Sequence, residues 1–202
     1  MITATRRTLL SLGATALLAL STAGCDQASK PAFKSIDITG ADYAQRLQLP
    51  DTEGKPRSLA DFKGKLVVVF FGYTQCPDVC PTTMQQLVET KRAMGPDGEK
   101  LQAVFVSLDP ARDTAELLKA YAGAFDPSFI GLRGNDEQVA AAAKEFKIFY
   151  RKVPGATPQS YTVDHTAASY VIDTTGKPRL YVRHGMPPAE LAADLKLLLQ
   201  RG

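Results

Sequence analysis

Two dense hydrophobic runs mark the centre of the expected fold. They are Leu66–Phe71 and Leu101–Leu108, and both are rich in valine and phenylalanine. Runs of this length and composition are typical of strands that are covered on both faces. Between them, hydrophobic residues recur at helical spacing from Met84 onward, and the pattern stops at Gly95. The pattern therefore predicts a strand, a helix and a second strand at the heart of an α/β domain.

The rest of the chain continues this alternation. Three more helices are predicted, the first after an N-cap at Asp113, the second opening at Asn135 and the third beginning at Pro187. Further strands are predicted at Phe129–Leu132, Ile148–Val153, Ala167–Ile172 and Arg179–Val182. A turn at 174–177 joins the last two strands into a hairpin, and residues 154–164 form a long loop. We therefore expect a mixed sheet with helices on both faces.

Weaker strand patterns precede the first hydrophobic run. They cover Phe33–Ile38 and Arg46–Leu49, and a turn signal at 51–54 leads into Arg57–Leu59. We expect them to form an N-terminal β-hairpin extension ahead of the core. The whole domain is predicted to span residues 33–202.

Residues 1–24 have the pattern of a signal peptide. Arg6 and Arg7 precede an apolar run from Leu9 to Leu20, and small residues follow. The run is short for a membrane span, which needs about 20 apolar residues. The arginine pair also resembles a twin-arginine export signal, although it can equally be the basic start of an ordinary signal peptide.

The residues after this leader predict a membrane tether. Thr22–Cys25 resembles a bacterial lipobox, in which Cys25 is lipidated and becomes the first residue of the mature protein. Asp26 follows it, and aspartate at that position signals inner-membrane retention in many Gram-negative lipoproteins. Residues 25–32 then form a short polar tether, and the domain lies at the periplasmic face of the inner membrane. The alternative is an ordinary cleavage site that leaves a free thiol at Cys25.

The composition limits the possible functions. The chain has 202 residues, is 45% hydrophobic and carries a formal net charge of +3 at pH 7. So small a charge gives no indication of nucleic-acid binding. Export places the chain in an oxidising compartment. There, two neighbouring thiols oxidise unless their reduction, or a metal that they hold, is part of their function.

Two cysteines lie between the first hydrophobic strand and the helix after it. Cys76 and Cys80 are each followed directly by a proline, which disfavours the helical conformation at the cysteine itself. We expect Pro81 at a first helical position, Cys80 at or just before the helix N-terminus, and Cys76 in the loop above it. The positive end of the helix dipole favours a thiolate at this place.

The spacing of the two cysteines suits either redox chemistry or a metal. Helical positions i and i+4 have Cβ atoms about 5–6 Å apart, whereas a disulfide needs about 3.5–4.5 Å. A bridge between Cys76 and Cys80 therefore needs a tightened turn, which the prolines can supply. A metal held by two sulfur atoms at about 2.3 Å each accepts a wider separation. A static disulfide, or two inert core thiols, is the remaining alternative.

A histidine can complete this site. His165 lies where the long loop re-enters the sheet, beside the first strand–helix turn in the expected topology. Two thiolates and a neutral imidazole suit Cu(I) or Cu(II), and zinc is chemically possible. On the residues alone, His165 is either this third ligand or an ordinary surface or core histidine. The second histidine, His184, is interpreted as an exposed turn residue, and Met84 as a helix-core residue.

Three acidic residues lie close to these positions in the sequence. Asp78 stands between the cysteines, Asp109 ends the neighbouring strand, and Asp164 precedes the histidine. Each can orient a ligand or contact a partner protein. Each can equally be a capping or solvated acid.

Taken together, these segments make the chain resemble the Sco/SenC family. The matching segments are Phe71–Pro81, Val106–Pro110 with Arg112-Asp113 behind it, Tyr150–Pro154, and Val163–Thr166 with Tyr170. The resemblance covers residues 45–200. The two Cys-Pro pairs with a distant Asp-His are its most specific elements.

The resemblance implies a function as well as a fold. Sco/SenC proteins are thioredoxin-like copper proteins that help to mature cytochrome c oxidase. Cys76, Cys80 and His165 would then be copper ligands. The family delivers copper to the dinuclear CuA centre of oxidase subunit II, or reduces the cysteines of that subunit so that copper can enter.

Three other functions compete with this interpretation, and the sequence speaks against the last of them. The chain can be a thioredoxin-like thiol–disulfide reductase that uses no copper, in which case it is primarily an enzyme. It can be a copper sensor or storage protein without a transfer partner. A peroxiredoxin-like peroxidase would need a Pro-x-x-x-Thr-x-x-Cys motif, which is absent upstream of Cys76.

Overall fold

The computed structural model describes residues 33–157 and 160–200. The predicted signal peptide, Cys25 and the tether lie outside the described residues. The helices are α1 (Val79–Ala93), α2 (Ala115–Phe125), α3 (Asp136–Glu145) and α4 (Pro188–Leu199), with short 3-10 helices η1 (Leu59–Phe62) and η2 (Gly95–Lys100). The strands are β1 (Ile36–Asp37), β2 (Gln48–Pro50), β3 (Pro56–Ser58), β4 (Leu66–Gly72), β5 (Leu101–Ser107), β6 (Ile130–Leu132), β7 (Tyr150–Val153), β8 (Thr162–His165), β9 (Ala168–Ile172) and β10 (Pro178–Arg183).

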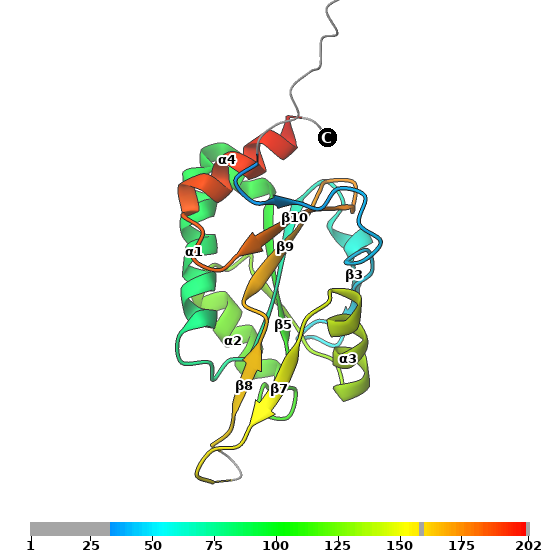
Figure 1. The fold of residues 1–202 in the computed structure, drawn as a ribbon, viewed down its shortest axis with the longest axis vertical. Helices are drawn as coiled ribbons and strands as arrows, with labels where there is room; N and C mark the ends of the chain where they lie inside the picture. The colour runs from blue at the N-terminus through cyan, green and yellow to red at the C-terminus, as the bar shows by residue number, and fades with distance from the viewer. Residues whose placement is uncertain (1–32, 158–159, 201–202) are drawn as a thin grey trace, which may run out of the picture. The chain divides into compact units, whose positions relative to one another are not determined.

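A six-stranded mixed sheet forms the middle layer, in the order β1-β10-β9-β4-β5-β6. β4, β5 and β6 run parallel, whereas β9 pairs antiparallel with β4 and with β10. Figure 1 shows α1, α2 and α4 on one side of this sheet and α3 on the other. The fold is the expected α/β class, a mixed sheet flanked by helices, so that prediction is confirmed.

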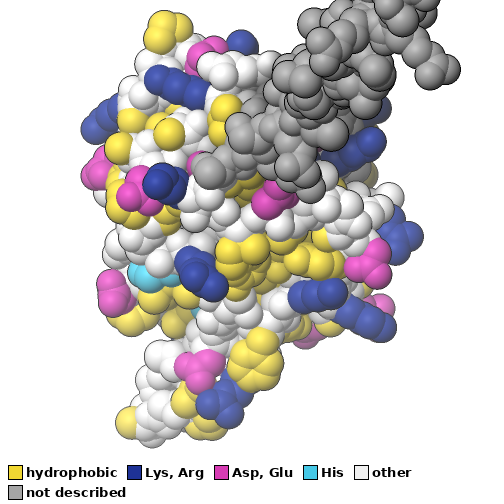
Figure 2. Space-filling view, turned by 45° about the horizontal axis from the view of Figure 1, so that its top comes forward, with side chains coloured by type: hydrophobic (Ala, Val, Ile, Leu, Met, Phe, Trp, Pro, Cys, Tyr) yellow, Lys and Arg dark blue, Asp and Glu magenta, His cyan; other side chains and the backbone are white. Residues whose placement is uncertain are grey.

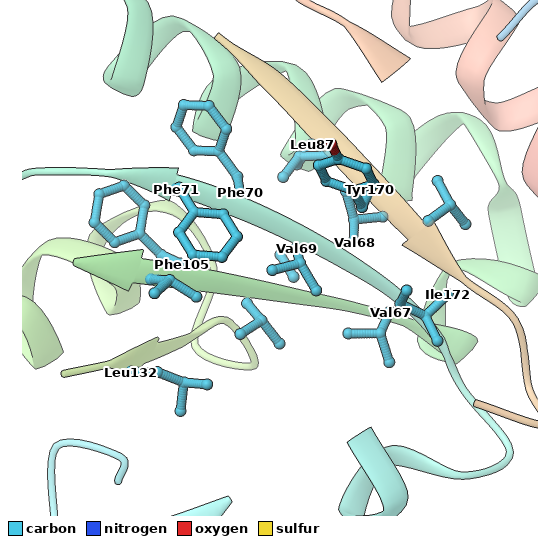
Figure 3. Close-up of a cluster of buried hydrophobic side chains, with 14 of the residues drawn as sticks. Val67, Val68, Val69, Phe70, Phe71, Leu87, Phe105, Leu132, Tyr170 and Ile172 are labelled. Carbon is cyan, nitrogen blue, oxygen red and sulfur yellow. The ribbon is translucent and has the colours of Figure 1, made fainter. Parts of the chain in front are cut away.

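The two central strands are buried along their whole length. Every residue of β4 and of β5 is buried, because helices cover both faces of the sheet. Figure 3 shows the side chains of β4 packed between those of β5, β9 and α1, with Phe70 close to Phe105. The rings of these two residues meet edge to face, with centroids 5.9 Å apart. The central strands therefore anchor the loops that follow them.

The N-terminal region differs in part from the sequence prediction. The predicted β-hairpin extension exists, since β2 and β3 pair antiparallel. The earlier strand pattern, however, contributes β1 to the edge of the main sheet, where Ile36 pairs with Tyr181. The amides of Lys34 and Ser35 also donate to the buried carboxylate of Asp194 in α4, at 2.9 and 2.8 Å. These long-range contacts draw the segment away from the hairpin.

Two further expectations were wrong in detail. The N-cap of α2 is Thr114, whose hydroxyl accepts from the amide of Leu117, and not Asp113. Residues 154–164 do not form one long loop, because their last part is β8, which pairs with β7 from Val153↔Thr162 to Tyr150↔His165. β7 and β8 form a separate hairpin that projects from one end of the domain, whereas the described chain begins at the opposite end (Figure 1).

Charged residues of both signs are interspersed on the surface. Figure 2 shows lysine, arginine and acidic side chains around a patch of hydrophobic side chains on the visible face. Within residues 33–157 and 160–200, no helix combines the length and the apolar character needed to cross a membrane.

Candidate metal centre

The two cysteines lie at the carboxyl end of β4. α1 begins at Val79, so Cys80 is inside its first turn and Cys76 lies in the preceding loop. The helix thus begins two residues before Pro81, earlier than the sequence predicted. Pro81 is tolerated there, because the first turn of a helix leaves its amides without intrahelical partners. Both cysteines are free thiols; Cys80 is fully buried, and Cys76 is partly exposed.

His165 reaches the same place from the other side of the chain. It is the last residue of β8, and its Nδ1 lies 3.0 Å from the carbonyl oxygen of Thr166. A carbonyl only accepts hydrogen bonds, so we assign the ring proton to Nδ1. In this tautomer of the neutral ring, Nε2 carries the free lone pair that can bind a metal, and it lies 3.5 Å from the Sγ of Cys80.

The three side chains form one compact group. Sγ of Cys76, Sγ of Cys80 and a ring nitrogen of His165 all lie within 4.8 Å of one another. Two ligand atoms that share one ion at about 2.3 Å each are at most about 4.6 Å apart. The group therefore needs only a slight contraction to hold a single metal ion.

The electrostatics distinguish the two thiols. The hydrogen bond from Cys80 lowers the pKa of Cys76 to about 3, assisted by His165 and by the amides of Asp78 and Cys80, and opposed by burial. The amide of Cys80 lies 3.4 Å from the Sγ of Cys76. The hydrogen bond to Cys76 and burial raise the pKa of Cys80 far above its usual range. The thiolate at the helix N-terminus is therefore Cys76, in the loop, and not Cys80.

The walls of the site come from β4 and the residue that follows it. The rings of Phe70 and Tyr73 meet the His165 ring edge on, with centroids 6.0 and 6.1 Å away. Gly72 lies behind Cys80, and a Cβ at this glycine would come within 2.7 Å of the Cys80 Sγ. The buried sulfur atom thus occupies space that any other residue at position 72 would fill.

The three acids singled out in the sequence have different surroundings. Asp78 is exposed at the N-cap position of α1, where it accepts a long hydrogen bond of 3.4 Å from Thr82. Asp164 is exposed and pairs with Arg151 at 3.1 Å. Asp109 is fully buried and accepts from Arg112 and from the hydroxyl of Tyr161. Of the three, Asp109 alone belongs to a buried network.

The sequence reasoning missed a second buried acid. Asp113 is fully buried and accepts hydrogen bonds from the hydroxyls of Thr74, at 2.6 Å, and Ser107, at 2.5 Å. Burial raises its pKa, opposed by these hydrogen bonds. Because Thr74 precedes Cys76 by two residues, Asp113 fixes the base of the cysteine loop. Its place in the Arg112-Asp113 segment was the available signal, but the residue was interpreted as a helix cap.

The remaining candidates lie outside the group. His184 is exposed in a turn, as expected, and its Nδ1 lies 3.1 Å from the hydroxyl of Thr83. Met84 is buried in the core, also as expected.

The fold and this group of side chains define a thioredoxin-like protein that carries two thiols and an imidazole within reach of one ion. Residues 37–200 match the family model described as SCO1/SenC. The chain therefore belongs to the SCO1/SenC family, and the resemblance seen in the sequence is confirmed.

Individual relatives agree with this assignment. A SCO2-like protein of Rickettsia felis is 37% identical over 161 residues, which cover 78% of this chain and 75% of the relative. The copper-bound structure of ScoI from Bradyrhizobium japonicum is 41% identical, with a TM-score of 0.69 over 76% of this chain and 97% of the other. BsSco, described as a member of the Sco family of cytochrome c oxidase assembly proteins with a disulfide switch, has a TM-score of 0.61 over 83% of this chain and 96% of the other. It is 19% identical to this chain, and that likeness shows the fold alone.

We predict that Gly72→Ala destabilises the protein by overpacking the space beside the Cys80 sulfur. The added methyl group must displace the Cys80 sulfur or the Phe105 ring, which lies within 3.0 Å of the new atom. Overpacking of this kind costs about 1–3 kcal/mol of folding free energy. Urea denaturation measures the loss. The matched control is Gly123→Ala in α2, where the new atom meets open space and stability should rise by up to about 1 kcal/mol. Equal effects of the two changes would contradict the packing argument.

The second prediction concerns the pH dependence of thiol reactivity. In the metal-free protein, the pKa of Cys76 of about 3 keeps it a thiolate, so its alkylation by iodoacetamide should be nearly independent of pH above about pH 5. Cys80 should react slowly, because it is buried and protonated. Mass spectrometry of peptides alkylated at each pH measures both rates. Cys80→Ala should raise the pKa of Cys76, since it removes the largest cause of the shift. A Cys76 rate that rises steeply between pH 7 and pH 9 would show that the assignment is wrong.

Proposed function

We propose that this protein is a copper metallochaperone that holds one copper ion through Cys76, Cys80 and His165. The observation that carries the proposal is the convergence of two sulfur atoms and one imidazole nitrogen within 4.8 Å. Thiolate and imidazole ligands together suit Cu(I) and Cu(II). The copper that is bound to the related ScoI of Bradyrhizobium japonicum supports this choice of metal.

The same thiols couple copper binding to redox chemistry. Copper needs both sulfur atoms as ligands, whereas a disulfide between Cys76 and Cys80 consumes both. A partner disulfide that oxidises the pair accepts the two electrons and leaves as a dithiol, and the copper ion then loses both sulfur ligands. Reduction by an external dithiol, which itself becomes a disulfide, would restore the ligands. Because the pKa of Cys76 is low, this ligand is already deprotonated before copper binds. Copper binding then has to displace a proton from Cys80 only.

A thioredoxin-like reductase that uses no copper is the second candidate. The low pKa of Cys76 favours it, because a thiolate is the nucleophile of disulfide exchange. In that case the Cys76 thiolate attacks a partner disulfide and Cys80 resolves the mixed disulfide. The partner leaves as a dithiol, and this chain retains the disulfide. Such a reaction does not require His165 as a ligand.

We predict that the three ligands are needed together for tight copper binding. Cys76→Ala and Cys80→Ala should each abolish it, and His165→Ala should weaken it at least about tenfold, because each removes one donor atom from the ion. Spectroscopic titration of the reduced domain, in competition with a copper chelator, measures stoichiometry and affinity. His184→Ala is the matched control, since that histidine is exposed and lies outside the group. Copper affinity that survives in all three ligand variants would leave the reductase as the better explanation.

We further propose that the acceptor is subunit II of cytochrome c oxidase and that the domain works at the periplasmic face of the inner membrane. The description of the Sco family as cytochrome c oxidase assembly proteins supports the first proposal. The lipobox-like Thr22–Cys25 and the arginine pair of the leader support the second. Lipidation of Cys25 would supply the membrane anchor.

Copper transfer to this acceptor gives a direct test. The copper-loaded domain is mixed with the metal-free, reduced soluble domain of oxidase subunit II. We expect the absorption spectrum of the CuA centre to develop, because the acceptor's cysteines compete for the ion. The Cys80→Ala variant supplied with the same total copper is the control for free copper. Failure of any transfer, while this chain keeps its copper, would favour a storage or sensing role.

A further inference from the structure

The hairpin that carries His165 is tied to the rest of the domain by a partly buried arginine. Arg112 lies in the loop between β5 and α2, and 14% of its side chain is exposed. Its Nε donates to the carboxylate of Asp109, which is fully buried. We call the contacts of Arg112 with Gln75, Asp109 and Tyr161 the Arg112 bridge.

The bridge spans the two halves of the metal centre. Nη1 of Arg112 donates to the carbonyl oxygen of Tyr161 at 2.8 Å and to the side-chain oxygen of Gln75 at 3.2 Å. Tyr161 directly precedes β8, whose last residue is His165, and Gln75 directly precedes Cys76. One guanidinium therefore bonds to the segment that leads to the imidazole and to the segment that leads to the thiolate.

Stacking and charge strengthen this connection. The guanidinium lies over the Tyr161 ring, 3.6 Å from its centroid. The Tyr161 hydroxyl donates to Asp109 at 2.7 Å, and Lys152 of β7 lies 3.8 Å from the same carboxylate. β7 and the residue that precedes β8 thus both contact the Asp109–Arg112 pair. Direct pairing between the main sheet and the hairpin is absent, since β7 and β8 form a sheet of their own.

We infer that Arg112 is a positioning residue that holds His165 against the two sulfur atoms, and that loosening the bridge is the step that opens the site. The effect on copper release rests on the proposed copper site. The role of Arg112 in holding the hairpin does not depend on that site. With the bridge intact, the imidazole stays within reach of the Cys80 sulfur. With the bridge broken, the hairpin is held by fewer contacts, among them the hydrogen bond between the Tyr73 side chain and the backbone of Val163. His165 is then free to leave while both cysteines remain in place.

Arg112→Lys tests this inference without leaving Asp109 unpaired. Lysine keeps the positive charge but has no planar fork that reaches Gln75 and Tyr161 together, and no flat surface to stack on the ring. Arg133→Lys is the matched control, because Arg133 bonds to the same loop, at the carbonyl oxygens of Pro110 and Asp113, and not to the hairpin. Tyr161→Phe is a second variant, which removes the hydroxyl bond to Asp109 and keeps the ring.

The first measurement is amide hydrogen exchange of the reduced, metal-free protein. In Arg112→Lys, the amides of β7 and β8 should exchange about tenfold faster, the effect of losing one or two net hydrogen bonds. Amides of β4 and β5 should keep their protection, and Arg133→Lys should leave the hairpin unchanged. Tyr161→Phe should give a smaller increase in the same strands. Unchanged exchange in the hairpin of Arg112→Lys, or an equal increase in Arg133→Lys, would overturn the inference.

The second measurement is the rate of copper release from the loaded protein to a chelator. Arg112→Lys should release copper on the order of 10-fold faster, because the ligand His165 is lost more often, while the alkylation rate of Cys76 in the metal-free protein stays that of wild type. If wild type binds no copper, the proposed function fails, and the exchange experiment still decides on the bridge. If copper binds normally and Arg112→Lys releases it at the wild-type rate, the inference fails and the copper site stands.

Discussion

The register of β4 with its two neighbours determines where the two thiols and the imidazole meet. β4 pairs in parallel with β5 and antiparallel with β9, so Phe70 lies beside Ser169. Cys76 follows Phe70 by six residues, and His165 precedes Ser169 by four residues. Two segments that are far apart in the chain therefore meet at one edge of the sheet. A shift of one residue in this pairing would turn the side chains of β4 to the opposite face.

Buried polar groups fix the positions of the cysteine loop and of the hairpin that carries His165. Asp113 fixes the cysteine loop through Thr74, and Asp109 holds Arg112 beneath the hairpin. Both carboxylates are fully buried, and burial without partners would cost several kcal/mol. Their hydrogen bonds to Thr74, Ser107, Arg112 and Tyr161 offset that cost and hold the surrounding loops in place. The cysteine loop and the hairpin that carries His165 thus rest on side chains that lie outside the group of Cys76, Cys80 and His165.

Local patterns predicted the centre of the fold and the composition of the site. The hydrophobic run of β4 and the Cys-Pro pairs are decided within a few residues, so the sequence alone indicates them. The choice of Thr114 over Asp113 as the cap of α2 depends on Ser107 and Thr74, which no local pattern reveals. β8 is short and partly exposed, and its pairing with β7 gives it strand structure inside an expected loop. The contact between Arg112 and Tyr161 joins residues 49 positions apart and was equally beyond local reasoning.

The start of the described chain and the β7–β8 hairpin lie at opposite ends of the domain (Figure 1). At the start of the described chain, the amides of Lys34 and Ser35 are bonded to α4. A lipid on Cys25 would pull on this end of the domain. The point of attachment would then lie at the end of the domain away from the hairpin that carries His165 (Figure 1). Attachment at one pole would leave the opposite pole free for docking.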